Sequence, residues 1–426
     1  MDARELAFKV LMDIEKNRSY ADIALKKYLN KTPLDPRDRA LATELVYGVV
    51  ERRNTLDYVI SSLSSKRSKP DIRALNVLRM GLYQIMYLDK IPPSAACDQA
   101  VELAKKHCGI GLSKFVNAII RSYLRNGVEF PEESLQPVKY LALKYSHPEW
   151  MVERFLKDYD YQFVRDFLDA NNRKAETCIR VNTLKTSDEE LTAILENEGF
   201  ETKRGKYAAE AIYVHGVKRI DKLNSYKDGL FHVQGESSML VSHMLDPKPG
   251  EFIIDVCGAP GGKATHIAQL MDNKGTVVAR DIYQHRVDLI LRNCKRLGVT
   301  IVKPQLYDAQ VLDWDMVDKA DRVLVDAPCT GYGVIRKKPD IKWYRNSEDE
   351  SELVNVQHRI LYNASRYVKK GGLLVYSTCT ITRRENEEQV NMFLLENRDF
   401  QLESSLALYP HIHGLDGFFI SCLRRK

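Results

Sequence analysis

Apolar residues recur every three or four positions along the first 126 residues of the chain. Leu6, Val10 and Ile14 form one such stripe. Others run through the segments 41–49, 56–60, 72–85, 95–106 and 114–124. This spacing places apolar side chains on one face of a helix, and Pro70 suits the first turn of the helix over 72–85. We therefore predict a compact all-α bundle over residues 1–126.

The pattern changes after this region. Prolines, a glycine and glutamates mark a linker over 127–139. From 140 to 227, helical stretches at 152–156 and 189–198 alternate with short β-like runs at 178–181 and 211–214. This mixture predicts a small α+β subdomain.

From residue 228 to 426, apolar runs alternate regularly with helical patterns. The runs expected to form strands cover 252–255, 276–279, 299–302, 322–325 and 373–376, with a last ribbon at 417–423. The helices expected between them cover 284–296, 350–368 and 385–395. Strands that alternate with helices are typical of a doubly wound α/β domain with a parallel sheet, so we predict a Rossmann-like fold.

A glycine-rich loop follows the first of these strands. It contains Cys257, Gly258, Ala259, Pro260, Gly261, Gly262 and Lys263. A phosphate-binding P-loop would need a longer glycine spacing and a hydroxyl where Ala264 stands, and the dinucleotide spacing G-x-G-x-x-G is absent. S-adenosylmethionine, which carries no phosphate, is the nucleotide ligand left, and an ordinary tight turn is the alternative.

Acidic residues follow the next strands of the predicted sheet. Asp281 comes about 20 residues after the glycine loop, where a carboxylate can accept from ribose hydroxyls. Asp308 follows the third strand and is expected near the adenine edge, and Asp326 ends the fourth. Ligands of open parallel sheets bind beyond the carboxyl ends of the strands, so these three residues favour a site at that edge.

Two cysteines lie at the same predicted edge. Cys329 follows Asp326 in an Asp-Ala-Pro-Cys-Thr-Gly turn, and Cys379 follows the fifth strand in Ser-Thr-Cys-Thr. A thiol beside a methyl donor indicates carbon methylation of a pyrimidine. C5 of cytosine is not nucleophilic by itself, but addition of a thiolate to C6 makes an enamine that can accept a methyl group at C5.

Composition and charge narrow the class of protein. The chain is 44% hydrophobic and 29% charged, and it has no apolar run of the length that spans a membrane. Its eight cysteines form no C-x-x-C pair, so we expect reduced thiols in a cytoplasmic protein without a metal site. Residues 1–130 hold 22 Lys and Arg against 15 Asp and Glu, which accounts for the whole net charge of +6. This surplus favours a nucleic-acid partner, and a solvated basic surface is the alternative.

Several motifs together resemble the Nol/Nop/Sun family of RNA cytosine-C5 methyltransferases. They are the glycine loop with Asp255, the turn at Cys329, Arg336-Lys-Lys-Pro-Asp-Ile-Lys-Trp343, Tyr376-Ser-Thr-Cys-Thr and Glu385-Asn-Glu387. Lys114-Phe-Val-Asn-Ala-Ile-Ile-Arg121 and the helical N-terminus resemble the NusB-like RNA-binding domain. Tyr145-Ser-His-Pro-Glu-Trp150 and Arg180-Val-Asn182 resemble the segment that precedes the catalytic domain in this family. The resemblance covers nearly the whole chain.

The resemblance implies a role for each matching residue. Cys379 is the expected nucleophile, Cys329 the group that assists product release, and Asp326 a contact of the cofactor or the cytosine ring. S-adenosylmethionine is expected to be held by the loop from Cys257 to Lys263 together with Asp281, Arg286, Asp308 and Asp326. The implied substrate is small-subunit (16S) ribosomal RNA, bound by a monomer through the NusB-like domain and the subdomain at 140–227. Candidate RNA contacts are Arg52, Arg53, Lys66, Arg67, Lys69, Lys105 and Lys106.

Three alternatives stay open at this point. The same motifs would serve a tRNA cytosine methyltransferase, because the substrate is assigned only from the N-terminal domain. An RNA-binding assembly factor with an inactive methyltransferase fold is disfavoured because Cys329 and Cys379 are both present. A DNA cytosine methyltransferase, in which the Pro-Cys thiol attacks, is disfavoured by the Ser-Thr-Cys-Thr motif.

Overall fold

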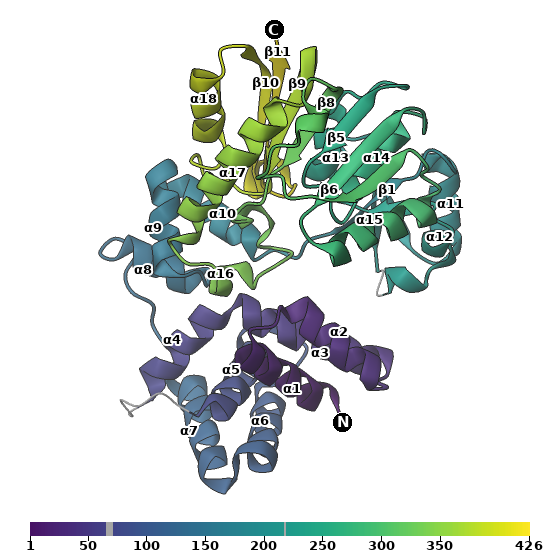
Figure 1. Ribbon diagram of the computed structural model, residues 1–426. Coiled ribbons are helices and arrows are strands. Elements are labelled where there is room, and N and C mark those ends of the chain that lie inside the picture. Colours follow the sequence, from purple (N-terminus) through teal and green to yellow (C-terminus); the bar gives the residue numbers. More distant parts are fainter. Residues whose placement is uncertain (65–70, 217–218) are drawn as a thin grey trace. The chain divides into compact units, whose positions relative to one another are not determined.

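The computed structural model describes residues 1–64, 71–216 and 219–426 and divides into two compact units (Figure 1). The first unit contains Met1–Asn172 together with Lys338–Arg345, and the second contains Arg173–Lys337 and Asn346–Lys426. Three of the candidate RNA contacts, Lys66, Arg67 and Lys69, lie outside the described residues, as does Pro70.

The first unit is helical, as predicted. Its described helices are α1 (Ala3–Asn17), α2 (Ala21–Lys31), α3 (Pro36–Glu51), α4 (Arg53–Leu63), α5 (Ile72–Tyr87), α6 (Pro93–Cys108), α7 (Ile110–Asn126), α8 (Pro137–Lys144), α9 (Glu149–Asp158), α10 (Tyr161–Asn171) and α16 (Ile341–Tyr344). The start of α3 shows how capping residues set where a helix begins. Asp35 accepts from the main-chain nitrogen atoms of Arg37 and Asp38, and Pro36 occupies the first helical turn.

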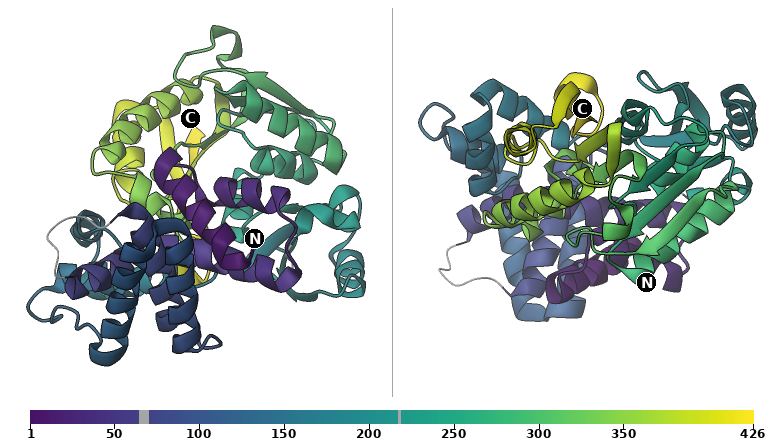
Figure 2. Two further views of the ribbon diagram at one scale, coloured as in Figure 1. Left: turned by 90° about the horizontal axis from the view of Figure 1, so that it is seen from below. Right: turned by 45° about the horizontal axis from the view of Figure 1, so that its top comes forward.

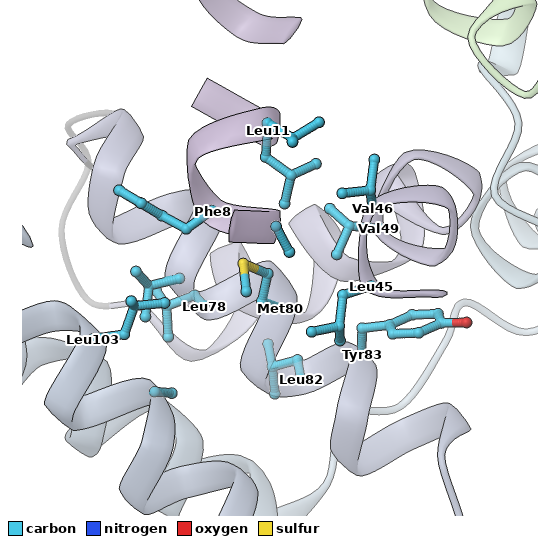
Figure 3. Close-up of a cluster of buried hydrophobic side chains, with 14 of the residues drawn as sticks. Phe8, Leu11, Leu45, Val46, Val49, Leu78, Met80, Leu82, Tyr83 and Leu103 are labelled. Atoms are coloured by element: carbon cyan, nitrogen blue, oxygen red, sulfur yellow. The ribbon is translucent and has the colours of Figure 1, made fainter. Parts of the chain in front are cut away.

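The core of this unit lies between α1, α3, α5 and α6 (Figure 3). Its labelled side chains are all buried: Phe8, Leu11, Leu45, Val46, Val49, Leu78, Met80, Leu82, Tyr83 and Leu103. Close helix approach needs a glycine at Gly48, because a Cβ atom there would lie only 1.9 Å from the Tyr83 ring. The Tyr83 hydroxyl donates to Glu44 at 2.7 Å.

The segment 338–345 completes this unit although it comes from the last third of the chain. Lys342 Nζ donates to the carbonyl oxygen of Glu51 at 2.8 Å, and Trp343 Nε1 donates to that of Val50 at 2.7 Å. Val50 and Glu51 end α3, where the last carbonyl groups have no partner within the helix. Burial lowers the pKa of Lys342 to about 7. The segment, called the α16 arm below, therefore caps the C-terminal end of α3.

The second unit begins with a small antiparallel sheet in the order β2-β3-β1-β4. Its elements are β1 (Thr177–Val181), α11 (Asp188–Asn197), β2 (Glu201–Arg204), β3 (Ala211–His215), η1 (Ile220–Lys222), α12 (Asn224–Lys227) and β4 (Phe231–Val233). An α+β subdomain was predicted over 140–227, and its exact bounds stay a prediction. The helices α8 to α10 belong to the first unit, where Thr55 of α4 donates to the carbonyl oxygen of Leu143 at 2.6 Å. At the other end β4 adds to the small sheet beyond residue 227.

A larger sheet follows in the order β10-β11-β9-β8-β5-β6-β7. Its strands are β5 (Phe252–Asp255), β6 (Thr276–Asp281), β7 (Val302–Leu306), β8 (Ala320–Asp326), β9 (Val368–Thr378), β10 (Phe400–Leu408) and β11 (Phe418–Arg425). The strands from β9 to β7 pair in parallel, and β11 and β10 add antiparallel at one edge. This confirms the predicted Rossmann-like α/β architecture.

Helices cover both faces of this sheet (Figures 1 and 2). One apolar cluster joins the sheet to α13 (Glu236–Leu245), α14 (Gly262–Leu270) and α15 (Gln284–Leu297), and another joins it to α17 (Asp349–Ser365) and α18 (Glu387–Glu396). Shorter elements are η2 (Trp314–Met316), η3 (Tyr332–Val334) and α19 (Pro410–His413). Among the described residues, no helix combines the length and apolar character needed to cross a membrane.

Candidate active site

The candidate site lies where β5, β6, β8 and β9 end at the same edge of the sheet. These strands pair in parallel, so the residues that follow them are brought together. The electrostatics confirm that the acidic residues converge. Burial raises the pKa of the Cys257 thiol well above its usual range, and the charges of Asp255, Asp281, Asp308 and Asp326 add to the shift.

The glycine loop turns sharply between β5 and α14. Gly261 has φ of 99°, in the left-handed region, and a side chain there would meet the backbone of Ile290 at 3.2 Å. A Cβ atom at Gly258 would meet the Asp255 carboxyl at 3.1 Å. The left-handed conformation favours glycine at Gly261, whereas a side chain at Gly258 would need only a small shift of its neighbours. The loop leads into α14, whose first main-chain N–H groups have no helical partner.

Donor and acceptor chemistry at this loop fits S-adenosylmethionine. Asp255 is fully buried, and its Oδ2 atom has no hydrogen-bond partner among the described residues. Asp281 is buried at the end of β6 and accepts from the main-chain nitrogen atom of Tyr283 at 3.0 Å. Buried carboxylate oxygens suit the hydroxyl groups of a ribose and the ammonium group of a methionine better than they suit phosphates.

Two other residues expected at the cofactor lie farther out. Arg286 is exposed on α15, and its nearest carboxylate atom, Asp281 Oδ2, is 3.9 Å away. Asp308 is partly buried and accepts from the main-chain nitrogen atom of Gln310 at 2.9 Å. Both stay predictions as cofactor contacts.

Lys263 lies on the thiol side of the loop. Its Nζ atom donates to Asp326 Oδ2 at 2.7 Å, and Ser377 Oγ donates to Asp326 Oδ1 at 2.9 Å. Asp326 therefore has both carboxylate oxygens hydrogen-bonded and is held between β8 and β9. The sequence predicted both Lys263 and Asp326 at the cofactor; the structure pairs them with each other, and their contact with the cofactor stays a prediction.

The two predicted cysteines meet. Cys329 Sγ and Cys379 Sγ lie 3.2 Å apart, and the main-chain N–H of Cys379 donates to Cys329 Sγ at 3.3 Å. The hydrogen bond with Cys379 raises the pKa of Cys329 above its usual range, and burial of the thiol is the second cause of this shift.

Sequence reasoning missed the groups that hold the two thiol loops. Glu385, in the loop before α18, is fully buried and accepts from Thr330 and Thr382. Gln357 of α17 donates to both Glu385 and the carbonyl oxygen of Pro328, each at 2.9 Å. The motif Glu385-Asn-Glu387 was noted in the sequence, but no residue within it was given a role. Its importance depends on partners more than 25 residues away in the chain.

One further polar cluster lies away from the thiols, between the small sheet and the helices α13 and α14. His243 Nε2 contacts Glu210 Oε1 at 2.8 Å, and His266 Nε2 lies 2.6 Å from the same oxygen. The sequence predicted no metal site, and these three ligand-type residues are too far apart in the chain to be recognised as a group. His243 is hydrogen-bonded to Glu210, whereas His266 Nε2 is buried without a hydrogen-bond partner among the described residues, and the three ligand-type atoms lie within 4.8 Å of one another.

The candidate RNA contacts of the first unit are engaged in ion pairs. Arg52 pairs with Glu51 and Arg53 with Glu15, while Lys105 pairs with Glu102 and Lys106 with Glu5. Exposed ion pairs contribute little free energy. The two lysines, whose side chains are more than half exposed, therefore keep the ability to bind phosphate.

Comparisons with known proteins agree with this geometry. The family model described as "16S rRNA methyltransferase RsmB/F" matches residues 242–424, the NusB family model matches 1–125, and a ferredoxin-like domain model of RsmF/B-like methyltransferases matches 147–221. "Probable ribosomal RNA small subunit methyltransferase B" of Bacillus subtilis (strain 168) is 38% identical over 99% of this chain and 98% of its own length.

Two solved structures are similar as well. PH0851 superposes with a TM-score of 0.85 and 28% identity, covering 100% of this chain and 99% of the other. NSun6 from Pyrococcus horikoshii, solved with the S-adenosylmethionine analogue SFG, has a TM-score of 0.60 and 26% identity over 65% of this chain and 98% of its own. The predicted family and the predicted cofactor are thereby confirmed. The chain belongs to the RsmB/F family of S-adenosylmethionine-dependent 16S rRNA methyltransferases.

Proposed function

We propose that this protein methylates C5 of a cytosine in small-subunit ribosomal RNA through a covalent bond between Cys379 and C6 of the base. The substrate follows from the name of the Bacillus subtilis relative and from the NusB match over residues 1–125. The observation that supports the chemistry is the pair of thiols 3.2 Å apart beside a hydrogen-bonded carboxylate, Asp326.

Cys379 is the nucleophile in this proposal. Its Ser-Thr-Cys-Thr motif resembles the one that carries the nucleophile in this family, and with the two Sγ atoms 3.2 Å apart only one thiol can readily ionise. Addition of the Cys379 sulfur to C6 breaks the aromatic character of the ring and makes C5 nucleophilic. S-adenosylmethionine supplies an electrophilic methyl group when it is bound by the glycine loop, Asp255 and Asp281.

Asp326 orients the base. Lys263 and Ser377 each donate to one oxygen of its carboxylate, so the group is held in one orientation. A carboxyl group at this place can accept from the N4 amino group of cytosine through one oxygen and donate a proton to N3 through the other, which balances the negative charge that the thiolate brings to the ring. Lys263, through its ion pair with Asp326, contributes to that electrostatic environment.

Cys329 assists release. After methyl transfer the C5 proton must leave before the bond between C6 and Cys379 Sγ can break. Cys329 Sγ is adjacent to that sulfur, and it is therefore the group assigned to this stage. The target base must leave its stack or loop to reach the thiols, as with other enzymes that act on base atoms.

The experiment that tests this proposal maps 5-methylcytosine across rRNA and tRNA from cells that lack the gene. We expect one or more positions in small-subunit rRNA to lose the modification and to regain it with the unaltered gene but not with Cys379→Ala. Loss confined to tRNA would replace the rRNA assignment by the tRNA one. A full complement of 5-methylcytosine in both RNA classes would overturn the proposal.

A further inference from the structure

We propose that Glu385 is a positioning residue that holds the Cys329 loop and the Cys379 loop in register for covalent catalysis. This inference rests on the proposed function for its catalytic meaning. Its carboxylate is hydrogen-bonded to residues that follow the two cysteines, and we propose that it acts through them. It lies in the loop that leads into α18 and is 0% exposed.

The Glu385 carboxylate accepts four hydrogen bonds. Oε2 accepts from the main-chain nitrogen atom of Thr330 and from Gln357 Nε2, each at 2.9 Å. Oε1 accepts from Thr330 Oγ1 at 2.5 Å and from Thr382 Oγ1 at 2.9 Å. Thr330 directly follows Cys329, and Thr382 lies three residues after Cys379, so one buried carboxylate binds the backbone or side chains of both loops.

A direct contact between the loops depends on this carboxylate. Thr330 Oγ1 and Thr380 Oγ1 lie 2.7 Å apart, and each residue directly follows one of the cysteines. A hydroxyl group has one proton to donate. Because Thr330 donates its proton to Glu385, Thr380 must donate to Thr330. The carboxylate therefore sets the direction of the hydrogen bond that links the two cysteine turns.

The neighbouring residues fix Glu385 itself. Tyr376 of β9 donates from its hydroxyl to the main-chain oxygen of Glu385 at 2.7 Å. Asn386 accepts from Thr378 Oγ1 at 2.5 Å and donates to the carbonyl oxygen of Thr380 at 3.2 Å. Glu385 is thus hydrogen-bonded to β9, the strand that precedes Cys379. Through Gln357 it is also connected to the loop that contains Cys329.

Replacement of Glu385 by glutamine removes part of its ability to accept hydrogen bonds and changes the size of the side chain little. One of its two terminal groups is an NH₂ donor, which cannot accept from the Thr330 nitrogen atom or from Gln357. Misplacement of a reacting group by about 1 Å can cost roughly 100-fold in rate. For Glu385→Gln we expect kcat to fall by roughly 10-fold to 100-fold, while the dissociation constant for S-adenosylmethionine changes little.

A second measurement reports the position of the sulfurs without methylation. Diamide oxidises two thiols to a disulfide and is itself reduced to the hydrazine, taking up both protons and both electrons. Disulfide formation needs specific geometry, so the rate of Cys329–Cys379 cross-linking reports loop register. The rate is followed by mass spectrometry of peptides in the full-length protein. We expect it to fall by roughly tenfold in Glu385→Gln, in proportion to the misplacement of the two turns.

Matched variants keep the test decisive. Glu388→Gln, an exposed position in the first turn of α18, should match the unaltered protein in both assays. Thr330→Val removes the linking hydroxyl and should lower kcat and cross-linking, whereas Thr330→Ser, which keeps the hydroxyl, should restore both. If Glu385→Gln does not fold, the Thr330 pair decides the question.

Two results would overturn the inference: unchanged cross-linking in both Glu385→Gln and Thr330→Val, or a loss of kcat matched by an equal loss of cofactor affinity. A protein that makes no 5-methylcytosine refutes the proposed function instead, and the cross-linking comparison then still decides the role of Glu385.

Discussion

The sulfur atoms of Cys329 and Cys379 lie 3.2 Å apart, although 50 residues separate the two cysteines in the chain. Parallel pairing of β8 with β9, which sets Asp326 opposite Ser377, brings the two turns together. Each cysteine ends its own strand-to-loop turn, so each can be replaced without removing an element of the sheet. Their roles in the proposed reaction can therefore be separated by mutation.

Replacement of each cysteine by alanine should give opposite results. Cys379→Ala should abolish methyl transfer and any covalent link to RNA, because it removes the nucleophile. Cys329→Ala should still add to the base and accept a methyl group but stall at release, so a covalent protein–RNA adduct should accumulate. A denaturing gel of each variant with RNA and S-adenosylmethionine shows the adduct as a slowly migrating band. An adduct trapped by Cys379→Ala and not by Cys329→Ala would reverse the two roles.

Asp281→Ala should weaken the binding of S-adenosylmethionine. The variant loses a buried carboxylate that can accept from a bound hydroxyl, and the expected cost is about 1–3 kcal/mol. RNA affinity should stay nearly the same. Calorimetric titration measures the cofactor affinity, with Asp288→Ala, an exposed position on α15, as the control. Equal affinities in Asp281→Ala and the unaltered protein would remove Asp281 from the cofactor site.

Asp255 should make stability depend on pH. Burial, with a contribution from the charge of Asp326, raises the pKa of Asp255 to about 7, above its ordinary value of 3.8. The folded state therefore binds a proton that the unfolded state has lost between about pH 4 and 7, and the free energy of unfolding falls across this window as pH rises. Asp255→Asn stays neutral, so it should gain roughly 2–4 kcal/mol over the unaltered protein as pH goes from 4 to 8.

Thermal melts of both proteins in the absence of cofactor, at several pH values, measure this difference. Asp288→Asn serves as an exposed control whose difference from the unaltered protein should not vary with pH. A constant difference between Asp255→Asn and the unaltered protein over the same range would show that the carboxyl group titrates normally.

The basic surface of the first unit should contribute to the salt dependence of RNA binding. Lys105 and Lys106 on α6 are more than half exposed. If both contact phosphates, the double variant Lys105→Gln/Lys106→Gln should reduce the slope of log affinity against log salt by about 1 to 2. Lys248→Gln, an exposed lysine of the second unit, is the control. An unaltered slope in the double variant would assign these lysines to a solvated surface.

The sequence predicted the elements whose apolar pattern is unambiguous. The strands over 252–255 and 322–325 are buried on both faces of the sheet and read as continuous apolar runs, so β5 and β8 lie close to where they were expected. The edge strand β10 is exposed from Gln401 to Ser405, where every side chain except that of Leu402 is polar, and it gave no such signal. The third strand was expected over 299–302 but covers Val302–Leu306, because β7 lies at the other edge with only its first residue buried.

The candidate site was predicted to the extent that it depends on strand ends. Cys329, Cys379 and Asp326 follow from parallel topology, and the structure brings them together. The partner of Lys263 and the role of Glu385 could not be predicted, because both depend on side-chain contacts between segments far apart in the chain. The burial of Lys342 could not be predicted either, because it depends on contacts with α3 and because lysine side chains are normally exposed.

The α16 arm has a consequence for how the protein is synthesised. The carbonyl groups of Val50 and Glu51 at the end of α3 receive their hydrogen bonds from Trp343 and Lys342. A ribosome must therefore polymerise almost 300 further residues before the first unit has all its parts. Until then the nascent N-terminal helices present an uncapped helix end. A fragment that stops at residue 172 lacks this closure permanently, whereas adding the 338–345 peptide in trans supplies the missing donors.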